Sequence, residues 1–131
     1  MYDELKALIL SDGESDVQCL SDEQVSAILA AYPDVPEDYL AYLVEIGWGA
    51  IAMSFVIYNG PKSFSDVYLR SDAPDTVVLI GDNMAGKCMG YDTSTWDIVE
   101  VLPGGVVQPL NTKFEYAIGE VCKELFEEVD D

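Results

Sequence analysis

The sequence has no histidine and few basic residues: 6 lysines and arginines stand against 25 aspartates and glutamates. Histidine is the commonest general base and the commonest transition-metal ligand, so its absence excludes Ser-His-Asp and Cys-His catalysis. The formal net charge is −19 at pH 7. A field of that sign repels nucleic acids, nucleotides and anionic membranes, and it attracts basic proteins and divalent cations. Acidity also serves solubility alone, and the net charge by itself does not separate these two roles.

Paired cysteines and long apolar runs are missing as well. Cys19, Cys88 and Cys122 are odd in number, far apart and outside any C-x-x-C motif, so we expect neither a disulfide framework nor a zinc site. The longest apolar run, Thr76 to Gly81, is far shorter than the ~20 residues that cross a bilayer. The chain starts Met1-Tyr2-Asp3-Glu4, with acids where a secretory signal carries lysine or arginine. We therefore expect a cytoplasmic protein without a membrane partner.

Hydrophobic residues make up 50% of the chain, so a single domain with its own core is expected over residues 1–131. The spacing of apolar residues predicts three N-terminal helices, at Tyr2–Leu10, Ser21–Tyr32 and Pro36–Ile46. Ser21 and Gln24 have the spacing of a capping box, and Pro33 ends that helix. Pro36 is predicted at the first position of the third helix, and Gly47 as its left-handed cap.

The middle of the chain is rich in β-branched and aromatic residues, which predicts strands. The predicted strands are Ile51–Tyr58, Val77–Gly81, Lys87–Tyr91, Trp96–Val101 and Val106–Gln108. The Asn59-Gly60-Pro61 sequence is predicted to end the first strand, Asp92–Thr95 to form a hairpin turn, and residues 103–105 to form another turn. The second strand is entirely apolar, which is typical of burial on both faces.

The C-terminal segment predicts one more helix. Thr112 and Glu115 have the spacing of a capping box, and Phe114, Ile118, Val121 and Leu125 recur at helical spacing. Gly119 is unfavourable in a helix interior by about 1 kcal/mol relative to alanine, which favours close packing against a neighbour at that point. Helices, then strands, then a helix predict an α+β fold, with N-terminal helices and a C-terminal helix packed on a single, mainly antiparallel sheet.

The segment Gly81–Lys87 resembles a phosphate-binding loop only superficially. It lacks the Walker A spacing and the Ser or Thr after the lysine, and it has no glutamate at the final EF-hand ligand position. A tight turn between two strands is the expected structure, since Asp82 and Asn83 suit such a turn. The scattered carboxylates have no recognised metal-binding spacing, so no metal, no cofactor and no small-molecule substrate are expected.

Four short motifs occur in an order that resembles the SUKH superfamily, which includes the yeast cell-wall assembly regulator. They are Pro-x-x-Tyr-x-x-Tyr-Leu-x-x-x-Gly-x-Gly at Pro36–Gly49, Ile-Tyr-x-Gly-Pro at Ile57–Pro61, Val-Leu-Ile-Gly-Asp-Asn at Val78–Asn83, and Gly-x-x-x-Gly-Tyr-Asp at Gly86–Asp92. The resemblance extends from about Asp22 to Phe126. The family's recurring positions correspond here to caps, turns and core residues: Pro36, Tyr39, Gly47, Gly49, Ile80, Gly81 and Gly86.

The resemblance implies a function through protein binding. Bacterial members look like immunity proteins encoded beside polymorphic toxins, many of them nucleases, and eukaryotic relatives act as regulatory interaction modules. The hypothesis it favours is a non-enzymatic immunity protein that occludes the active site of a basic toxin. The alternative is a regulatory or scaffolding module without a toxin partner. A carboxylate-based hydrolase is a third hypothesis, which the missing histidine and the absence of paired-acid spacing oppose.

Surface aromatic residues beside acids are the expected contacts with such a partner. Trp48 lies between two glycines and is predicted in the core, whereas Trp96 fits a core or an interface position equally well. For the interface we predict Trp96 and Tyr91 as anchors. The charged rim around them is predicted to comprise Asp82, Asp92, Asp97 and Glu100.

Overall fold

The strands form one antiparallel sheet in which each strand pairs with the next along the chain. The computed structural model describes residues 2–63, 76–102 and 106–127. Within them the sheet has seven strands, in the order of the sequence: β1 (Asp16–Gln18), β2 (Trp48–Ile51), β3 (Phe55–Ser63), β4 (Val77–Asp82), β5 (Cys88–Asp92), β6 (Asp97–Val101) and β7 (Val107–Pro109). The predicted turn at residues 103–105 lies outside the described residues.

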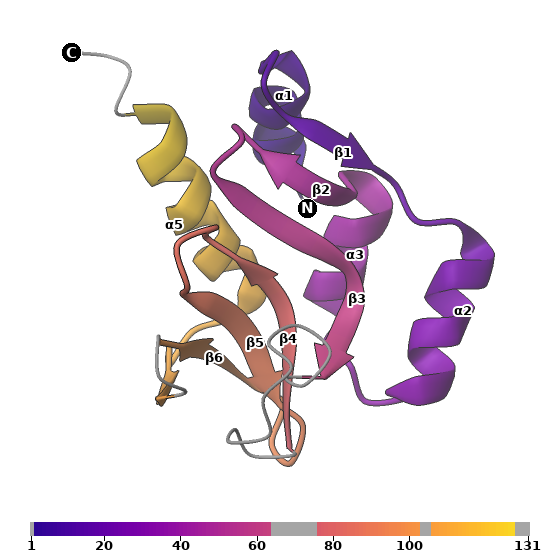
Figure 1. Ribbon diagram of the computed structural model, residues 1–131. Coiled ribbons are helices and arrows are strands. Elements are labelled where there is room, and N and C mark those ends of the chain that lie inside the picture. Colours follow the sequence, from indigo (N-terminus) through magenta and orange to yellow (C-terminus); the bar gives the residue numbers. More distant parts are fainter. Residues whose placement is uncertain (1, 64–75, 103–105, 128–131) are drawn as a thin grey trace.

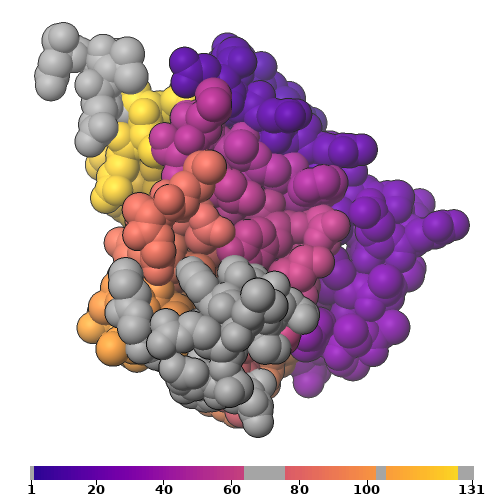
Figure 2. All heavy atoms as spheres, viewed as in Figure 1, coloured from indigo at the N-terminus to yellow at the C-terminus, as the bar shows by residue number. Residues whose placement is uncertain are grey.

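Helices α3 and α5 pack against the same face of this sheet (Figure 1). The helices of the described residues are α1 (Asp3–Ser11), α2 (Asp22–Ala31), α3 (Glu37–Glu45) and α5 (Phe114–Glu127). Helix α1 lies beside α5 across a groove lined by residues from Glu115 to Phe126, and α2 projects at one side of the molecule (Figures 1 and 2). The predicted α+β architecture, with N-terminal helices and a C-terminal helix on a single sheet, is confirmed.

The predicted start of α2 is confirmed in atomic detail. The Gln24 amide donates to Ser21 Oγ, and the Ser21 amide donates back to Gln24 Oε1 at 2.9 Å, which completes a capping box. Pro36 is the N-cap of α3 rather than its first helical residue. After α3, Gly47 has a φ of +122°, and its amide donates to the Tyr42 carbonyl at 3.0 Å.

The start of α5 differs from the prediction. In place of a capping box between Thr112 and Glu115, the Glu115 amide donates to Asp38 Oδ2 at 3.1 Å, so the first turn is capped from α3. Gly119 also differs, because a Cβ placed there would have no atom outside its own helix within 4 Å. This glycine faces open space, and its place in the helix is not explained by close packing.

Two strand predictions were wrong. The predicted strand Ile51–Tyr58 is divided by a turn, because Ala52 and Met53 have φ values of +53° and +54° and reverse the chain between β2 and β3. The Asn59-Gly60-Pro61 sequence does not end β3, which continues to Ser63 across a register shift that absorbs the extra residues. The apolar strand β4, the two strands of the β5–β6 hairpin and the short strand β7 were predicted to within one residue at each end. Strand β4 is buried from Val77 to Gly81, as its apolar sequence indicated.

Two glycines of the sheet allow neighbouring strands to approach closely. A Cβ at Gly49 would lie 2.1 Å from the Asp16 carbonyl oxygen, and one at Gly81 would lie 2.5 Å from the Val56 carbonyl oxygen. Real side chains do not tolerate such contacts, so the pairing of β1 with β2 and of β3 with β4 needs glycine at these positions.

The core between α3, α5 and the sheet is built on aromatic rings. Phe114 contacts Tyr39 and Tyr42 edge to face, with ring centroids 5.3 and 5.4 Å apart, and Tyr39 contacts Tyr91 at 5.8 Å. The hydroxyls of Tyr39, Tyr42 and Tyr91 are buried without a hydrogen-bond partner. A second buried cluster forms on the strands β4, β5 and β6, and its members are Val77, Leu79, Cys88, Val99 and Val101.

Candidate partner-binding surface

The end of the β5–β6 hairpin carries two facing carboxylates. Asp92 and Asp97 are opposite partners in the ladder, which places like charges side by side. Asp92 is held by the turn, since its Oδ1 accepts from the Ser94 hydroxyl at 2.6 Å and from the Ser94 amide at 3.0 Å. Hydrogen bonds from the Ser94 side chain and backbone lower the pKa of Asp92. The Asp92 carboxylate therefore presents stable negative charge at neutral pH.

The two predicted aromatic anchors have different environments. Trp96 has a φ of +59° and a half-buried ring that packs against Tyr32 and Tyr91, with centroids 6.0 and 5.6 Å apart. Tyr91 is only 2% exposed and belongs to the core. Because an anchor must be reached by its partner, the prediction for Tyr91 does not fit this structure, and Trp96 is the accessible aromatic residue of the pair.

The four predicted rim acids do not form one cluster. Asp82 pairs with Cys88, which lies at the opposite end of β5 from Asp92. The four positions between Cys88 and Asp92 correspond to about 13 Å at roughly 3.3 Å per residue. The Asp82 carboxylate accepts from the Tyr58 hydroxyl and from the Met84 amide. Glu100 is one position from the buried Val99 and Val101, so strand alternation directs it to the helix-covered face. Only Asp92 and Asp97 are therefore close neighbours.

A cleft of about 420 Å³ lies beside the hairpin end, between the first turns of α3 and α5. We call it the hairpin cleft. Trp96 and Asp97 line it from the hairpin, with Tyr91 beneath them. The remaining charged groups that line it come from helix starts and the loop before α5, and they are Glu37, Asp38, Glu115 and Lys113. Four carboxylates and one ammonium give this cleft a negative potential beside an aromatic wall.

Asp38 connects the elements around the hairpin cleft. Its Oδ1 accepts from the Tyr39 amide at 2.9 Å, and its Oδ2 accepts from the Glu115 amide of α5. Its carbonyl oxygen accepts from the Tyr2 hydroxyl at 2.6 Å. Asp38 lies in the predicted helix Pro36–Ile46, but the sequence does not indicate this role, because the Glu115 amide is 77 positions away. No local motif reports a contact of that kind.

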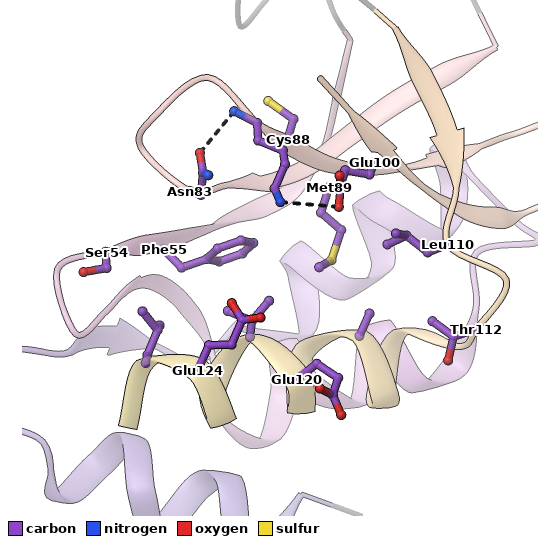
Figure 3. Close-up of a pocket in the computed structure, with 14 residues that line it drawn as sticks. Ser54, Phe55, Asn83, Cys88, Met89, Glu100, Leu110, Thr112, Glu120 and Glu124 are labelled. Carbon is purple, nitrogen blue, oxygen red and sulfur yellow. Dashed lines mark hydrogen bonds and ion pairs between the residues drawn. The ribbon is translucent and has the colours of Figure 1, made fainter. Parts of the chain in front are cut away.

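A second cleft, of about 320 Å³, lies between α5 and the sheet (Figure 3). We call it the α5 cleft. Its apolar lining includes Phe55, Met89 and Leu110 from the sheet side, and Val121 and Leu125 from α5. Its charged lining consists of Lys87, Glu100, Glu120 and Glu124. The Lys87 ammonium lies 3.7 Å from Glu100 Oε2, a contact drawn as a dashed line in Figure 3. Of the predicted rim acids, Glu100 alone lines this cleft.

Neither cleft has the donor set of a metal centre. Within residues 2–63, 76–102 and 106–127, no three Cys, Asp or Glu side chains are grouped closely enough to hold a metal ion. Cys19 is exposed, whereas Cys88 and Cys122 are buried. In the same described ranges, each helix lacks the length and apolar character needed to span a bilayer.

Comparison of the chain with protein-family models, with curated proteins and with solved structures gave no match.

Proposed function

We propose that this protein is a cytoplasmic, SUKH-like immunity protein that binds and neutralises a cognate basic toxin, with a nuclease toxin domain as the expected partner. The observation that carries the proposal is the hairpin cleft. There a half-buried tryptophan lines a cleft together with four acidic residues, Glu37, Asp38, Asp97 and Glu115. A negative cleft with an accessible aromatic wall suits lysine or arginine side chains of another protein.

The chemistry of nucleases supports occlusion of the active site as the mode of neutralisation. A nuclease holds phosphates with lysine and arginine, and a surface rich in carboxylates can take the place of those phosphates. Trp96 would supply buried contact area at the centre, and Asp97 would supply charge at the rim. The net charge of −19 would steer the encounter, with association rates of about 10⁸ M⁻¹s⁻¹ or more at low salt.

Co-expression with the toxin encoded by the adjacent gene tests the proposal. We expect the wild type to restore growth and to co-elute with the toxin on a sizing column. Asp97→Lys reverses one exposed charge at the hairpin cleft and should weaken protection. Glu14→Lys makes the same charge change at an exposed turn residue outside both clefts and should protect like the wild type. Persistent toxicity with the wild type and no complex would refute the proposed function.

A further inference from the structure

We propose that the α5 cleft is a second contact site for the partner, and that it receives an arginine side chain flanked by apolar residues of the partner's chain. This inference rests on the proposed function, because it takes the partner to be a basic protein. It adds a site that is distinct from the hairpin cleft and assigns the chemistry of its occupant.

The cleft has the size and lining for an amphipathic side chain. Its volume of about 320 Å³ is at the lower end of the range for binding pockets, roughly 300 to 1,000 Å³. Phe55 and Met89, both buried, form its sheet side, and the half-buried Val121 and Leu125 face them from α5. Arginine buries its aliphatic stem against such surfaces and keeps its charged end at the polar edge.

The charges around this lining favour a cation. Figure 3 shows Glu124 extending from α5 toward the sheet, whereas Glu120, one turn earlier, points away from it. Glu100 approaches from β6, and its side chain is 25% exposed. Two carboxylates on opposite walls of an apolar cleft match a guanidinium, whose fork of N–H donors binds carboxylates in a bidentate manner.

Lys87 occupies the position that the partner's arginine would take. Its ammonium lies 3.7 Å from Glu100 Oε2, which is a loose pair, and the Lys87 side chain is 47% exposed. Its backbone is fixed at the rim, because Asn83 Oδ1 accepts from the amides of Ala85 and Lys87. Lys87 therefore partly neutralises Glu100 in the free protein and competes with an incoming cation. Removal of this lysine should strengthen binding in the cleft.

The test is a titration of the ¹⁵N-labelled full-length protein with the peptide acetyl-Leu-Arg-Leu-Leu-amide, followed by NMR. We expect amide shifts concentrated at residues 83–89 and 117–125. Glu100→Gln and Glu124→Gln should each weaken binding about threefold, and Lys87→Met should tighten it about threefold, as expected for partly exposed charge pairs. The matched controls are Glu14→Gln, at an exposed turn residue that lines neither cleft, and Lys123→Met, which lies in the groove between α1 and α5. Both controls should leave the affinity within experimental error.

Three results would overturn the assignment. They are shifts located away from the cleft, equal binding of a peptide with glutamate in place of arginine, or equal effects of the cleft variants and their controls. The toxin assay separates this inference from the proposed function. If Glu100→Gln/Glu124→Gln protects fully and also binds the peptide like the wild type, the α5 cleft is not a contact site and the immunity function stands. If the wild type itself fails to protect, the proposed function fails whatever the peptide does.

Discussion

Gly119 has room for a side chain in the folded protein. Gly119 lies inside α5, and a Cβ added there would contact nothing outside the helix within 4 Å. Gly119→Ala should therefore raise the free energy of unfolding by about 1 kcal/mol, which is the difference in helix propensity. Urea unfolding followed by circular dichroism measures this change. Gly49→Ala is the contrasting variant and should be strongly destabilising, because its Cβ would lie 2.1 Å from the Asp16 carbonyl oxygen. A loss of stability in Gly119→Ala would contradict the structure.

The buried phenols make stability fall at alkaline pH. Burial raises the pKa of Tyr39, Tyr42 and Tyr91, and burial raises the pKa of Cys122 to about 12. Below about pH 7.5 these groups are protonated in both states, so their contribution is fully present. Above that pH the unfolded chain releases protons that the folded state retains, and each group removes up to about 1.4 kcal/mol per pH unit.

Tyr42→Phe tests this pH dependence at one residue. The Tyr42 hydroxyl has no hydrogen-bond partner, so its removal should leave stability at pH 8 unchanged or slightly higher. At pH 11 the stability of the variant should exceed that of the wild type by a wider margin. The reason is that the variant lacks one of the phenols that ionise more readily in the unfolded chain than in the folded protein. Urea unfolding at both pH values gives the comparison. An equal loss in the two proteins between pH 8 and pH 11 would contradict the assignment.

At the scale of elements, Asp38 couples the starts of α3 and α5. Its carboxylate accepts one amide from each helix. Asp38→Ala should lower the free energy of unfolding by about 1 to 3 kcal/mol, since an N-terminal cap and a contact between elements are lost together. Asp38→Asn retains one acceptor oxygen, so its free energy of unfolding should lie between those of the wild type and Asp38→Ala. Asp34→Ala replaces an exposed aspartate of the preceding loop and is the control in chemical denaturation. Equal stability of the Asp38 and Asp34 variants would show that the cap contributes nothing.

The elements that were predicted correctly have local signals. The capping box of α2, the apolar run of β4 and the turn residues of the β5–β6 hairpin all act within a few residues of chain. The turn between β2 and β3 has no such signal, because it places Ala52 and Met53 at positive φ, where glycine, asparagine and aspartate are the usual residues. Strand β1 has three residues, and its pairing with β2 depends on the close approach at Gly49.

The candidate sites were predictable only where their residues are close together in the sequence. Trp96 and Asp97 were found because they are adjacent in a recognisable hairpin. Tyr91 was placed at the surface, although the alternation of β5 puts it on the helix-covered face with Met89. The acids of the hairpin cleft from α3 and α5 meet only when the two helices pack together, and the α5 cleft likewise joins distant segments. Local spacing carries no information about either arrangement.

At the scale of the whole molecule, the net charge of −19 opposes compaction. Self-repulsion among carboxylates is weakened when salt shortens the Debye length, from about 20 Å at ~0.02 M to about 4 Å at ~0.5 M. The melting temperature of the free protein should therefore rise over this range. A gain of about 1 kcal/mol corresponds to about 4 °C for a domain of this size. Calorimetry in NaCl and in an equal concentration of an uncharged osmolyte separates screening from general stabilisation. A melting temperature that does not respond to NaCl would contradict the claim that self-repulsion destabilises the fold.

Salt should weaken association with a basic partner, although it stabilises the free protein. Screening removes long-range attraction, so the association rate with the toxin should fall at least tenfold between ~0.02 and ~0.5 M salt. Dissociation depends on contacts that exclude water, and Trp96→Ala should mainly speed dissociation with little dependence on salt. Asp97→Lys should instead slow association at low salt, and its difference from the wild type should shrink as salt rises. Surface plasmon resonance at several salt concentrations resolves the two rates. An association rate independent of salt would mean that the acidity of this chain serves solubility alone, and the case for a basic partner would lose its electrostatic support.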